Sequence, residues 1–370
     1  MKYFEKYQLK HFNFILVAAV IALSVIGVLA VGSATPSAQS KQVFGVCLGI
    51  VAMLIVAFID LEWILNFYWV IYAGNLLLLL YVDFFGASYN GAQRWINLGF
   101  TTLQPSDLTK IFLILFFAKF LMDREKKIRE PLFIIKCVLL VAPSLYLILK
   151  QPNLSTTICI AMVFCVLMFL AGLSYKFIGI VLAIAIPVLV IFIGVVQMPN
   201  QPFLEEYQQK RILAWLYPEK YASDTGYQQQ NSITAIGSGQ LDGKGLNNNT
   251  TTSVKNGNFL LEADTDFIFA IIGEELGFVG CCSVIFLLLL IIIQCIIIGL
   301  RAQTLLGQII CGGMAALIAI QSFINMGVAT GVLPNTGLSL PFVSAGLTSV
   351  VCFYAGIGFV LNVGLQPKKY

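Results

Sequence analysis

Three carboxylates lie within five residues in the second half of the chain, at Glu262, Asp264 and Asp266. A long apolar run follows them directly. Neighbouring negative charges repel one another, so such a cluster is expected to face cations, either basic side chains or a divalent metal. Helix capping explains one acidic residue at the start of a helix and leaves the other two unexplained. We therefore predict a functional role for the cluster.

A second pair of charges lies at the start of another apolar run. Lys110 follows Asp107 by three residues, which places both on one face of a helix. Ionisable residues at membrane depth are costly and are candidates for function by default. A helix start capped by Ser106 or Asp107, with a local ion pair, explains the same spacing equally well. The spacing alone leaves both interpretations open.

The segment from Gly237 to Gly245, GSGQLDGKG, is rich in glycine and contains Lys244. Glycine-rich turns expose backbone N–H groups that suit phosphate. The segment is not a Walker A loop, because its spacing differs and no Ser or Thr follows the lysine. A flexible hinge is an equally good interpretation. Further along, Glu274 and Glu275 point to different sides of a helix, and we expect them to pair with Lys or Arg elsewhere.

The amino-acid composition indicates whether these residues are placed in water or in lipid. Of the 370 residues, 59% are hydrophobic and 11% are charged, which is too little charge to cover a soluble domain. In lipid every backbone polar group is satisfied internally, which leaves helices and closed barrels. The apolar runs are long and continuous, so we predict an all-α polytopic membrane protein. Topology accounts for the net charge of +4, and no nucleic-acid partner is expected.

We predict about ten transmembrane helices, because a span needs roughly 20 apolar residues. The predicted spans are 13–33, 43–60, 63–83, 106–122, 132–149, 154–173, 176–197, 267–299, 305–329 and 342–364. The first is too long for the apolar core of a signal peptide, so we interpret it as an uncleaved anchor. The whole chain, 1–370, is predicted to form a single membrane domain.

Basic residues in the short connections predict the orientation. With the N-terminus inside, the inner segments hold eleven Lys and Arg residues and the short outer segments hold three. Both termini are therefore predicted to be cytoplasmic, and segment 198–265 is predicted to be one large extracytoplasmic loop. A second outer segment, 86–105, contains Arg94 among apolar and aromatic residues. We expect an interfacial or re-entrant element there.

The nine cysteines are scattered, and eight of them lie inside apolar runs. None has metal-ligand spacing with the single histidine, His11, and none lies in the predicted outer loop. We predict that these cysteines pack as small apolar residues and form neither a metal site nor a disulfide framework.

Several separated stretches resemble one family of membrane proteins. They are, in order along nearly the whole chain, GAQRWINLG at 91–99, QPSDLTK at 104–110, QPNLST at 151–156, DTGYQ at 224–228, AIGSG at 235–239, TDFIF at 265–269, GEELG at 273–277, LPNTG at 333–337 and LPFVS at 340–344. Together they resemble the SEDS family (shape, elongation, division and sporulation). The resemblance implies a ten-span peptidoglycan glycosyltransferase of the bacterial cytoplasmic membrane that polymerises lipid II. It also implies a class B penicillin-binding protein as the partner that crosslinks the product.

The resemblance implies roles for particular residues. Asp266 matches the catalytic aspartate of the family, and we expect it to take the proton from the attacking 4-hydroxyl group. Lys110, supported by Arg94 or Arg211, is the expected clamp for the departing diphosphate. Further expected substrate contacts are Asp107, Glu262, Lys244, Gln104 and Ser344. We also expect a divalent cation, Mg²⁺ or Mn²⁺, near Asp266 and Asp107. We expect no nucleotide.

The chain departs from the family pattern at four places. Asp107 replaces a glutamate, Asn153 replaces an aspartate, and Asp264 replaces a frequent histidine. The sequence AGLTS at 345–349 replaces the usual YGGSS. Because Asn153 carries no charge, we assign no charge-dependent role to that position.

Two classes of function remain open at this point. An α-linked diphosphate that becomes a β-1,4 bond implies inversion in one displacement, so no second carboxylate is needed as nucleophile. The alternative is a flippase or another transporter of lipid-linked precursors, because polar residues at membrane depth suit both functions. A non-catalytic scaffold leaves the acidic cluster unexplained. The sequence leaves open whether the protein serves elongation, division or sporulation.

Overall fold

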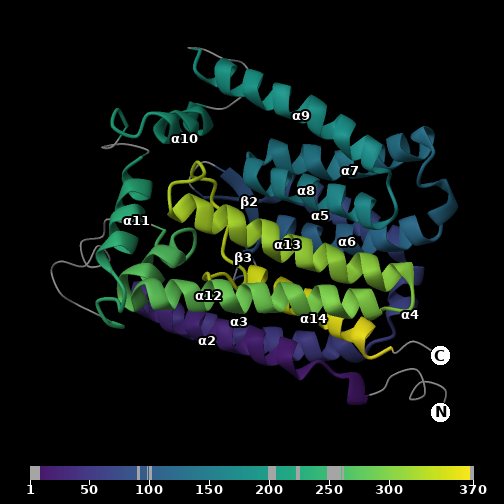
Figure 1. Cartoon of the computed structure of the whole chain (residues 1–370), viewed down its shortest axis with the longest axis horizontal. Helices are drawn as coiled ribbons and strands as arrows, with labels where there is room; N and C mark the ends of the chain where they lie inside the picture. Colours follow the sequence, from purple (N-terminus) through teal and green to yellow (C-terminus); the bar gives the residue numbers. More distant parts are fainter. Residues whose placement is uncertain are drawn as a thin grey trace.

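The computed structural model describes residues 9–89, 92–97, 99, 102–198, 206–221, 226–247, 260 and 262–366. Parts of the predicted outer loop, 198–265, therefore lie outside the described residues. Figure 1 shows a bundle whose helices run roughly along the long axis of the molecule. The start of α2 (Phe14–Ala34) and the end of α14 (Leu347–Gly364) lie at one end of the bundle. The helices α10 (Glu206–Leu216) and α11 (Tyr227–Ser238) lie at the opposite end.

Each of the ten predicted spans corresponds to a helix, which confirms the all-α membrane fold. Seven of these helices are long and apolar enough to cross a membrane by length and composition alone. Among the other three, α6 carries three charged residues and α8 has only 17 residues. The helices between α2 and α14 that match predicted spans are α3 (Pro36–Phe58), α5 (Tyr68–Phe85), α6 (Pro105–Met122), α7 (Pro131–Lys150), α8 (Leu154–Leu170), α9 (Tyr175–Val196), α12 (Ile268–Arg301) and α13 (Leu305–Ala329).

Capping side chains and prolines explain where several helices begin. Asn13 and Asn153 accept hydrogen bonds from the first turns of α2 and α8, as N-cap residues do. The helices α3, α6 and α7 each begin with proline, whose fixed φ suits the first turn. Helix α14 begins at Leu347 instead of the predicted 342, because Phe342 and Gly346 have φ values of +64° and +148°. Neither value is compatible with a right-handed helix.

Segment 86–105 contains a small antiparallel sheet of three strands, β1 (Ala87–Tyr89), β2 (Ala92–Asn97) and β3 (Thr102–Leu103). Strand β2 pairs with both neighbours. The sequence predicted an interfacial or re-entrant element here and did not identify the strands. The remaining short elements are η1 (Leu9–His11), α4 (Leu61–Asn66) and η2 (Glu125–Lys127).

Small residues allow the central helices to approach closely. A Cβ atom at Gly49 of α3 would lie 2.6 Å from the ring of Tyr354 in α14. A Cβ atom at Gly358 of α14 would lie 2.7 Å from the carbonyl oxygen of Met53 in α3. Close backbone contact of this kind supplies the packing that holds helices together in lipid. The same bundle places α12 against both α13 and α2.

Helix α12 is interrupted at Gly277, which has φ +64° and ψ −159°. The glycine-rich segment 240–245 lies against this interruption and supplies hydrogen bonds that the helix lacks there. The N–H groups of Phe278 and Val279 donate to the carbonyl oxygens of Gln240 and Leu241 at 2.8 and 3.2 Å, and the N–H groups of Lys244 and Gly245 donate to those of Glu274 and Glu275 at 2.9 and 3.0 Å. The interruption is therefore satisfied by protein backbone, as irregular structure at membrane depth requires.

Candidate functional site

Asp266 lies in a turn, residues 262–267, that leads directly into α12. The backbone N–H groups of Thr265 and Phe267 both donate to the carbonyl oxygen of Glu262, at 3.4 and 3.1 Å. The side chain of Thr265 also donates to the Glu262 carboxylate at 3.1 Å. The turn is therefore closed by hydrogen bonds among its own residues.

Helix α13 and the loop that follows it, residues 330–346, hold this turn in place. Asn325 Nδ2 donates to the carbonyl oxygen of Asp266 at 2.9 Å. Ser344 Oγ donates to the carbonyl oxygen of Thr265 at 2.6 Å and accepts from the N–H of Leu340 at 2.7 Å. Ser344, expected as a substrate contact, thus has its hydroxyl engaged with the backbone of the acidic turn.

The carboxylate of Asp266 is half-buried and lies beside a glycine. A Cβ atom at Gly337 would be 3.2 Å from Asp266 Oδ2. Gly337 is exposed and has φ +72°, a conformation that favours glycine. Because Gly337 has no side chain, this position adds no atom that would cover the carboxylate oxygen.

Among the described residues, four charged side chains act on the Asp266 carboxylate: Glu262 and Asp264 from its own turn, Arg211 from α10 and Arg94 from β2. Burial is the largest cause and raises the pKa of Asp266, Glu262 raises it further, and the two arginines oppose them. The resulting pKa is about 6. A carboxylate with a pKa this close to neutral pH is well suited to general base chemistry. The structure thus brings Arg94, Arg211 and Glu262 together around Asp266.

The two arginines reach the site from different elements. Arg94 donates from Nε to the carbonyl oxygen of Gln151 at 2.8 Å and from Nη2 to that of Pro152. These contacts fix the guanidinium of β2 against the connection between α7 and α8. Arg211 lies on α10, and Trp215 of the same helix donates to the carbonyl oxygen of Gly331 at 3.1 Å. Both cations are thereby attached to segments far from Asp266 in the sequence.

Lys110 forms a separate, buried cluster. Its Nζ lies 2.7 Å from Asp107 Oδ1 and 2.9 Å from Gln321 Oε1. Gln321 in turn donates to the carbonyl oxygen of Ser339 at 2.8 Å. The structure shows the local ion pair that the spacing allowed. The capping expected from Ser106 or Asp107 is wrong, because Gln104 is the N-cap and both residues lie inside the helix.

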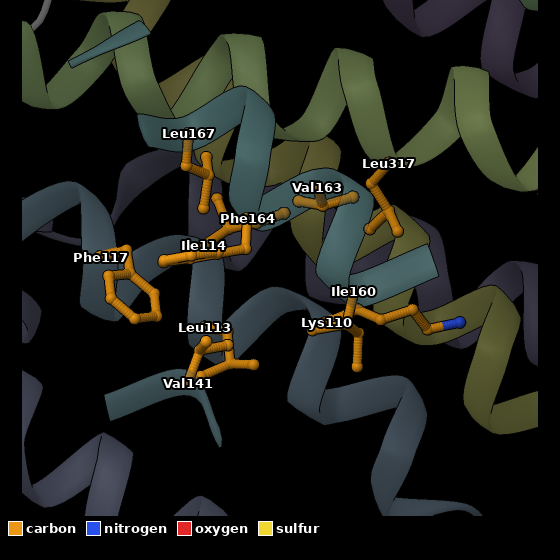
Figure 2. A pocket seen from close by; sticks show the side chains of 10 residues that line it. All are labelled: Lys110, Leu113, Ile114, Phe117, Val141, Ile160, Val163, Phe164, Leu167 and Leu317. Carbon is orange, nitrogen blue, oxygen red and sulfur yellow. The ribbon is translucent and has the colours of Figure 1, made fainter. Parts of the chain in front are cut away.

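A small cavity of about 10 Å³ lies beside Lys110, among side chains of α6, α7, α8 and α13 (Figure 2). The volume is about that of one water probe. Figure 2 shows the Lys110 ammonium pointing away from the apolar side chains that line it. These are Leu113, Ile114, Phe117, Val141, Ile160, Val163, Phe164, Leu167 and Leu317. The cavity is a gap in apolar packing and offers nothing to a diphosphate.

The loop 330–346 connects the two clusters. Gln321, which binds Lys110, also binds Ser339. Asn325, which binds the backbone of Asp266, also donates to the carbonyl oxygen of Leu338 at 2.7 Å. Residues 338 and 339 are adjacent, so Lys110 and the acidic turn are linked to the same piece of chain through Gln321 and Asn325.

Two other expected substrate contacts have partners within the protein. Lys244 Nζ lies 2.8 Å from Glu274 Oε1, so the pairing expected for Glu274 is confirmed. Glu275 accepts a hydrogen bond from Ser33 Oγ of α2. The backbone N–H of Lys244 is used by α12, which argues against a phosphate-binding turn. Gln104 Nε2 donates to Ser106 Oγ at 3.0 Å.

The described residues do not fit a resident metal ion. No group of three or more His, Cys, Asp or Glu side chains that could hold a metal occurs in the described part of the chain. Asp107, one of the two expected ligands, is paired with Lys110.

Three residues of the site, Asn325, Gln321 and Gly337, were not predicted from the sequence. A signal was present for the first two, because both are polar residues inside the apolar run 305–329. They lie four residues apart and thus on one helical face, and polar residues at membrane depth are costly unless they have a role. Gly337 ends the stretch LPNTG at 333–337, which resembles the family, but this stretch does not indicate that the glycine lies beside Asp266.

Comparison with known proteins identifies relatives over almost the entire chain. Residues 5–369 match the FtsW/RodA/SpoVE family model, described as cell cycle protein. The peptidoglycan glycosyltransferase MrdB of Escherichia coli is 33% identical over 367 residues, which cover 97% of this chain and 95% of MrdB. The probable peptidoglycan glycosyltransferase FtsW of Geobacter metallireducens is 31% identical over 380 residues, with 98% and 96% covered.

Solved structures show the same fold. A chain from a peptidoglycan synthase complex, described as structurally coordinating polymerization and crosslinking, superposes with a TM-score of 0.79 at 28% identity, covering 95% of this chain and 97% of that one. The rod shape determining protein RodA of Thermus thermophilus superposes with a TM-score of 0.70 at 26% identity, with 97% and 98% covered. The chain belongs to the FtsW/RodA/SpoVE family of cell cycle proteins, which is the SEDS family that its motifs resemble.

Proposed function

We propose that this chain is a peptidoglycan glycosyltransferase that polymerises lipid II into β-1,4 glycan strands at the outer face of the bacterial cytoplasmic membrane. The observation that carries the proposal is the Asp266 carboxylate, which lies beside the exposed Gly337 and on which Arg94 and Arg211 both act. A base beside fixed cations is what displacement of a diphosphate by a hydroxyl group requires. Relatives named as peptidoglycan glycosyltransferases support the same activity.

The proposed orientation places both termini in the cytoplasm and segment 198–265 outside. The bias of basic residues supports this orientation. So does the bundle, because the start of α2 and the end of α14 lie at one end while α10, α11 and the start of α12 lie at the other (Figure 1). Asp266, which directly precedes α12, then faces the side on which lipid II is extended. The chain is proposed to act as one membrane domain over residues 1–370.

The proposed reaction is a single inverting displacement. The 4-hydroxyl oxygen of one sugar attacks the anomeric carbon of another, the bond from that carbon to the diphosphate oxygen breaks, and Asp266 accepts the hydroxyl proton. Arg94 and Arg211 stabilise the negative charge that develops on the diphosphate. No covalent glycosyl–enzyme intermediate forms, so a second carboxylate is not needed.

Lys110 was expected to be the main diphosphate clamp, and the structure gives reason to revise that role. Its ammonium is buried and already bound to Asp107 and Gln321. We therefore assign the diphosphate to the arginines around Asp266. Lys110 supports the loop 330–346 through the hydrogen bond from Gln321 to Ser339.

A divalent cation enters the proposal only as a companion of the substrate. Mg²⁺ commonly binds through one or two carboxylates together with substrate phosphates, so Asp266 could share such an ion with the diphosphate. Polymerisation that a chelator abolishes and added Mg²⁺ or Mn²⁺ restores would support this arrangement. Polymerisation that continues in chelator would exclude it.

A class B penicillin-binding protein is the proposed partner. Support comes from the similarity to a chain of a peptidoglycan synthase complex that coordinates polymerization and crosslinking. A flippase for lipid-linked precursors is the competing function, and it predicts lipid movement without glycan synthesis.

Reconstitution in liposomes with lipid II tests the proposal. The wild-type protein is expected to produce glycan strands, and Asp266→Ala is expected to lose about 10²–10⁴-fold in rate while inserting normally. Asp242→Ala is the matched control, because it removes an exposed carboxylate from segment 198–265. Near-normal polymerisation by Asp266→Ala would refute the role of that residue, and lipid translocation without polymer would favour the flippase.

A further inference from the structure

The side chain of Asn325 joins the acidic turn to the loop that faces it. Asn325 lies in α13 and is 1% exposed. Its Nδ2 group donates two hydrogen bonds, one to the carbonyl oxygen of Asp266 at 2.9 Å and one to that of Leu338 at 2.7 Å. These two acceptors are 72 residues apart in the sequence. One amide group therefore joins two distant segments, alongside the contacts that Ser344 makes with the same turn and loop.

The orientation of this amide follows from its neighbours. Both acceptors are carbonyl oxygens, so the opposite orientation would place Asn325 Oδ1 against two oxygens of like polarity. In the described part of the structure, Oδ1 is buried without a hydrogen-bond partner. The two donated bonds are therefore the polar interactions that fix this side chain.

The position of these bonds connects them to the chemistry. Leu338 directly follows Gly337, whose Cβ position lies 3.2 Å from Asp266 Oδ2. Asn325 thus binds the backbone of Asp266, the proposed base. It also binds the backbone of Leu338, which is the residue next to Gly337. Together with Ser344, this amide keeps the Asp266 carboxylate next to Gly337.

We propose that Asn325 is a positioning residue for polymerisation, holding the Asp266 carboxylate in place beside Gly337. The inference rests on the proposed function, because it assigns a role within the same site. Asn325 does not contact the reacting atoms in this scheme. It acts through Asp266, and a displacement of about 1 Å at a reacting group lowers rates by about 10²-fold.

Loss of the amide has a defined electrostatic consequence. The charged groups that face Asp266 are Glu262 and Asp264 from its own turn, Arg211 from α10 and Arg94 from β2. Burial is the largest cause of its raised pKa. A turn released from α13 admits water, which weakens the effect of burial. The acid limb of the pH–rate profile is therefore expected to move to lower pH.

The chain contains a matched control at the other end of the bundle. Asn362 of α14 is fully buried, and its Nδ2 donates to the carbonyl oxygens of Val56, Ala57 and Ile59 at 3.1, 3.0 and 2.6 Å. These bonds join α14 to the end of α3, as those of Asn325 join α13 to the acidic turn. Asn362→Leu removes comparable hydrogen bonds without touching the acidic turn.

The experiment compares the wild-type protein, Asn325→Leu and Asn362→Leu in lipid II liposomes, with rates normalised to folded, inserted protein. Asn325→Leu is expected to lower kcat by about 10- to 100-fold with little change in KM. Its acid limb should also lie at lower pH than that of the wild type. Asn362→Leu is expected to lower the melting temperature and to keep the wild-type kcat and pH profile.

A second variant keeps the test decisive if Asn325→Leu inserts poorly. Asn325→Ser retains one hydroxyl donor, and its kcat is expected to lie between those of the wild type and Asn325→Leu. Wild-type kcat and pH profile in either Asn325 variant, or an equal loss of kcat in Asn362→Leu, would overturn the positioning role and leave the proposed function standing. A wild-type protein that makes no glycan would instead refute the proposed function.

Discussion

At the scale of single residues, the environment of Asp266 determines how activity should depend on pH. Burial and the neighbouring Glu262 raise its pKa to about 6, while Arg211 and Arg94 act in the opposite direction. A base works only when it is deprotonated, so the raised pKa places the loss of activity on the acid side. Below pH 6 we expect kcat/KM to fall by about tenfold per pH unit.

Charge-neutral variants test the origin of this acid limb. Glu262→Gln removes a like charge, so the pKa of Asp266 should fall and the limb should move to lower pH. Arg211→Gln removes an opposing cation, so the limb should move to higher pH. Polymerisation rates measured from pH 4.5 to 8 check both shifts, and a limb that stays in place in both variants would mean that another group titrates.

The buried ion pair between Lys110 and Asp107 also leads to a prediction about single residues. Removing one member of a buried ion pair leaves an uncompensated charge, which typically costs about 3–5 kcal/mol. We expect Lys110→Met to lower the melting temperature strongly and Lys110→Met/Asp107→Asn to recover much of that loss. Because we assign the diphosphate to the arginines, polymerisation should recover with stability in the double variant. A stable double variant that makes no glycan would show that Lys110 contacts the substrate.

At the scale of elements, α12 depends on the segment that fills its interruption. Gly277 has a backbone conformation that is essentially restricted to glycine. A Cβ atom there would lie 2.4 Å from the backbone nitrogen of Gly243. The ion pair between Lys244 and Glu274 holds the same junction. The part of α12 that follows Asp266 is thereby attached to segment 226–247.

Gly277→Ala is expected to destabilise the protein, because both the strained conformation and the contact with Gly243 oppose a side chain. Strain of this kind costs about 1–3 kcal/mol, and the contact adds to it. Gly74→Ala in α5 is the control, since a Cβ atom there meets nothing within 4 Å and alanine favours the helix. Thermal melting of the purified variants measures both, and equal melting temperatures would contradict the role of the interruption.

At the scale of the whole molecule, the arrangement of the bundle predicts which segments reach each side of the membrane. Asp242 and Glu125 are both exposed and lie in segments predicted to be on opposite sides. In a cysteine-free background, Asp242→Cys should react with an impermeant thiol reagent in intact cells. Glu125→Cys should react only after permeabilisation. The reverse pattern would invert the proposed topology and place Asp266 on the cytoplasmic side.

The sequence by itself determined the ten helical spans and the presence of an acidic cluster before α12, and it predicts the orientation in the membrane. These features depend on local properties, since the length of an apolar run and the bias of nearby basic residues act over one segment at a time. The start of α14 was placed too early, because the residues from Phe342 to Gly346 are apolar enough for a span but adopt non-helical φ values. Hydrophobicity alone does not reveal that conformation.

Only the tertiary structure decided which side chains meet. It brought Arg94 and Arg211 to Asp266, left Lys110 with Asp107 and Gln321, and used the glycine-rich segment to complete α12. Each of these contacts except that of Lys110 with Asp107 joins residues far apart along the chain. Partners of this kind are chosen by how helices pack and how buried polar groups are satisfied, and no spacing within one segment specifies that choice.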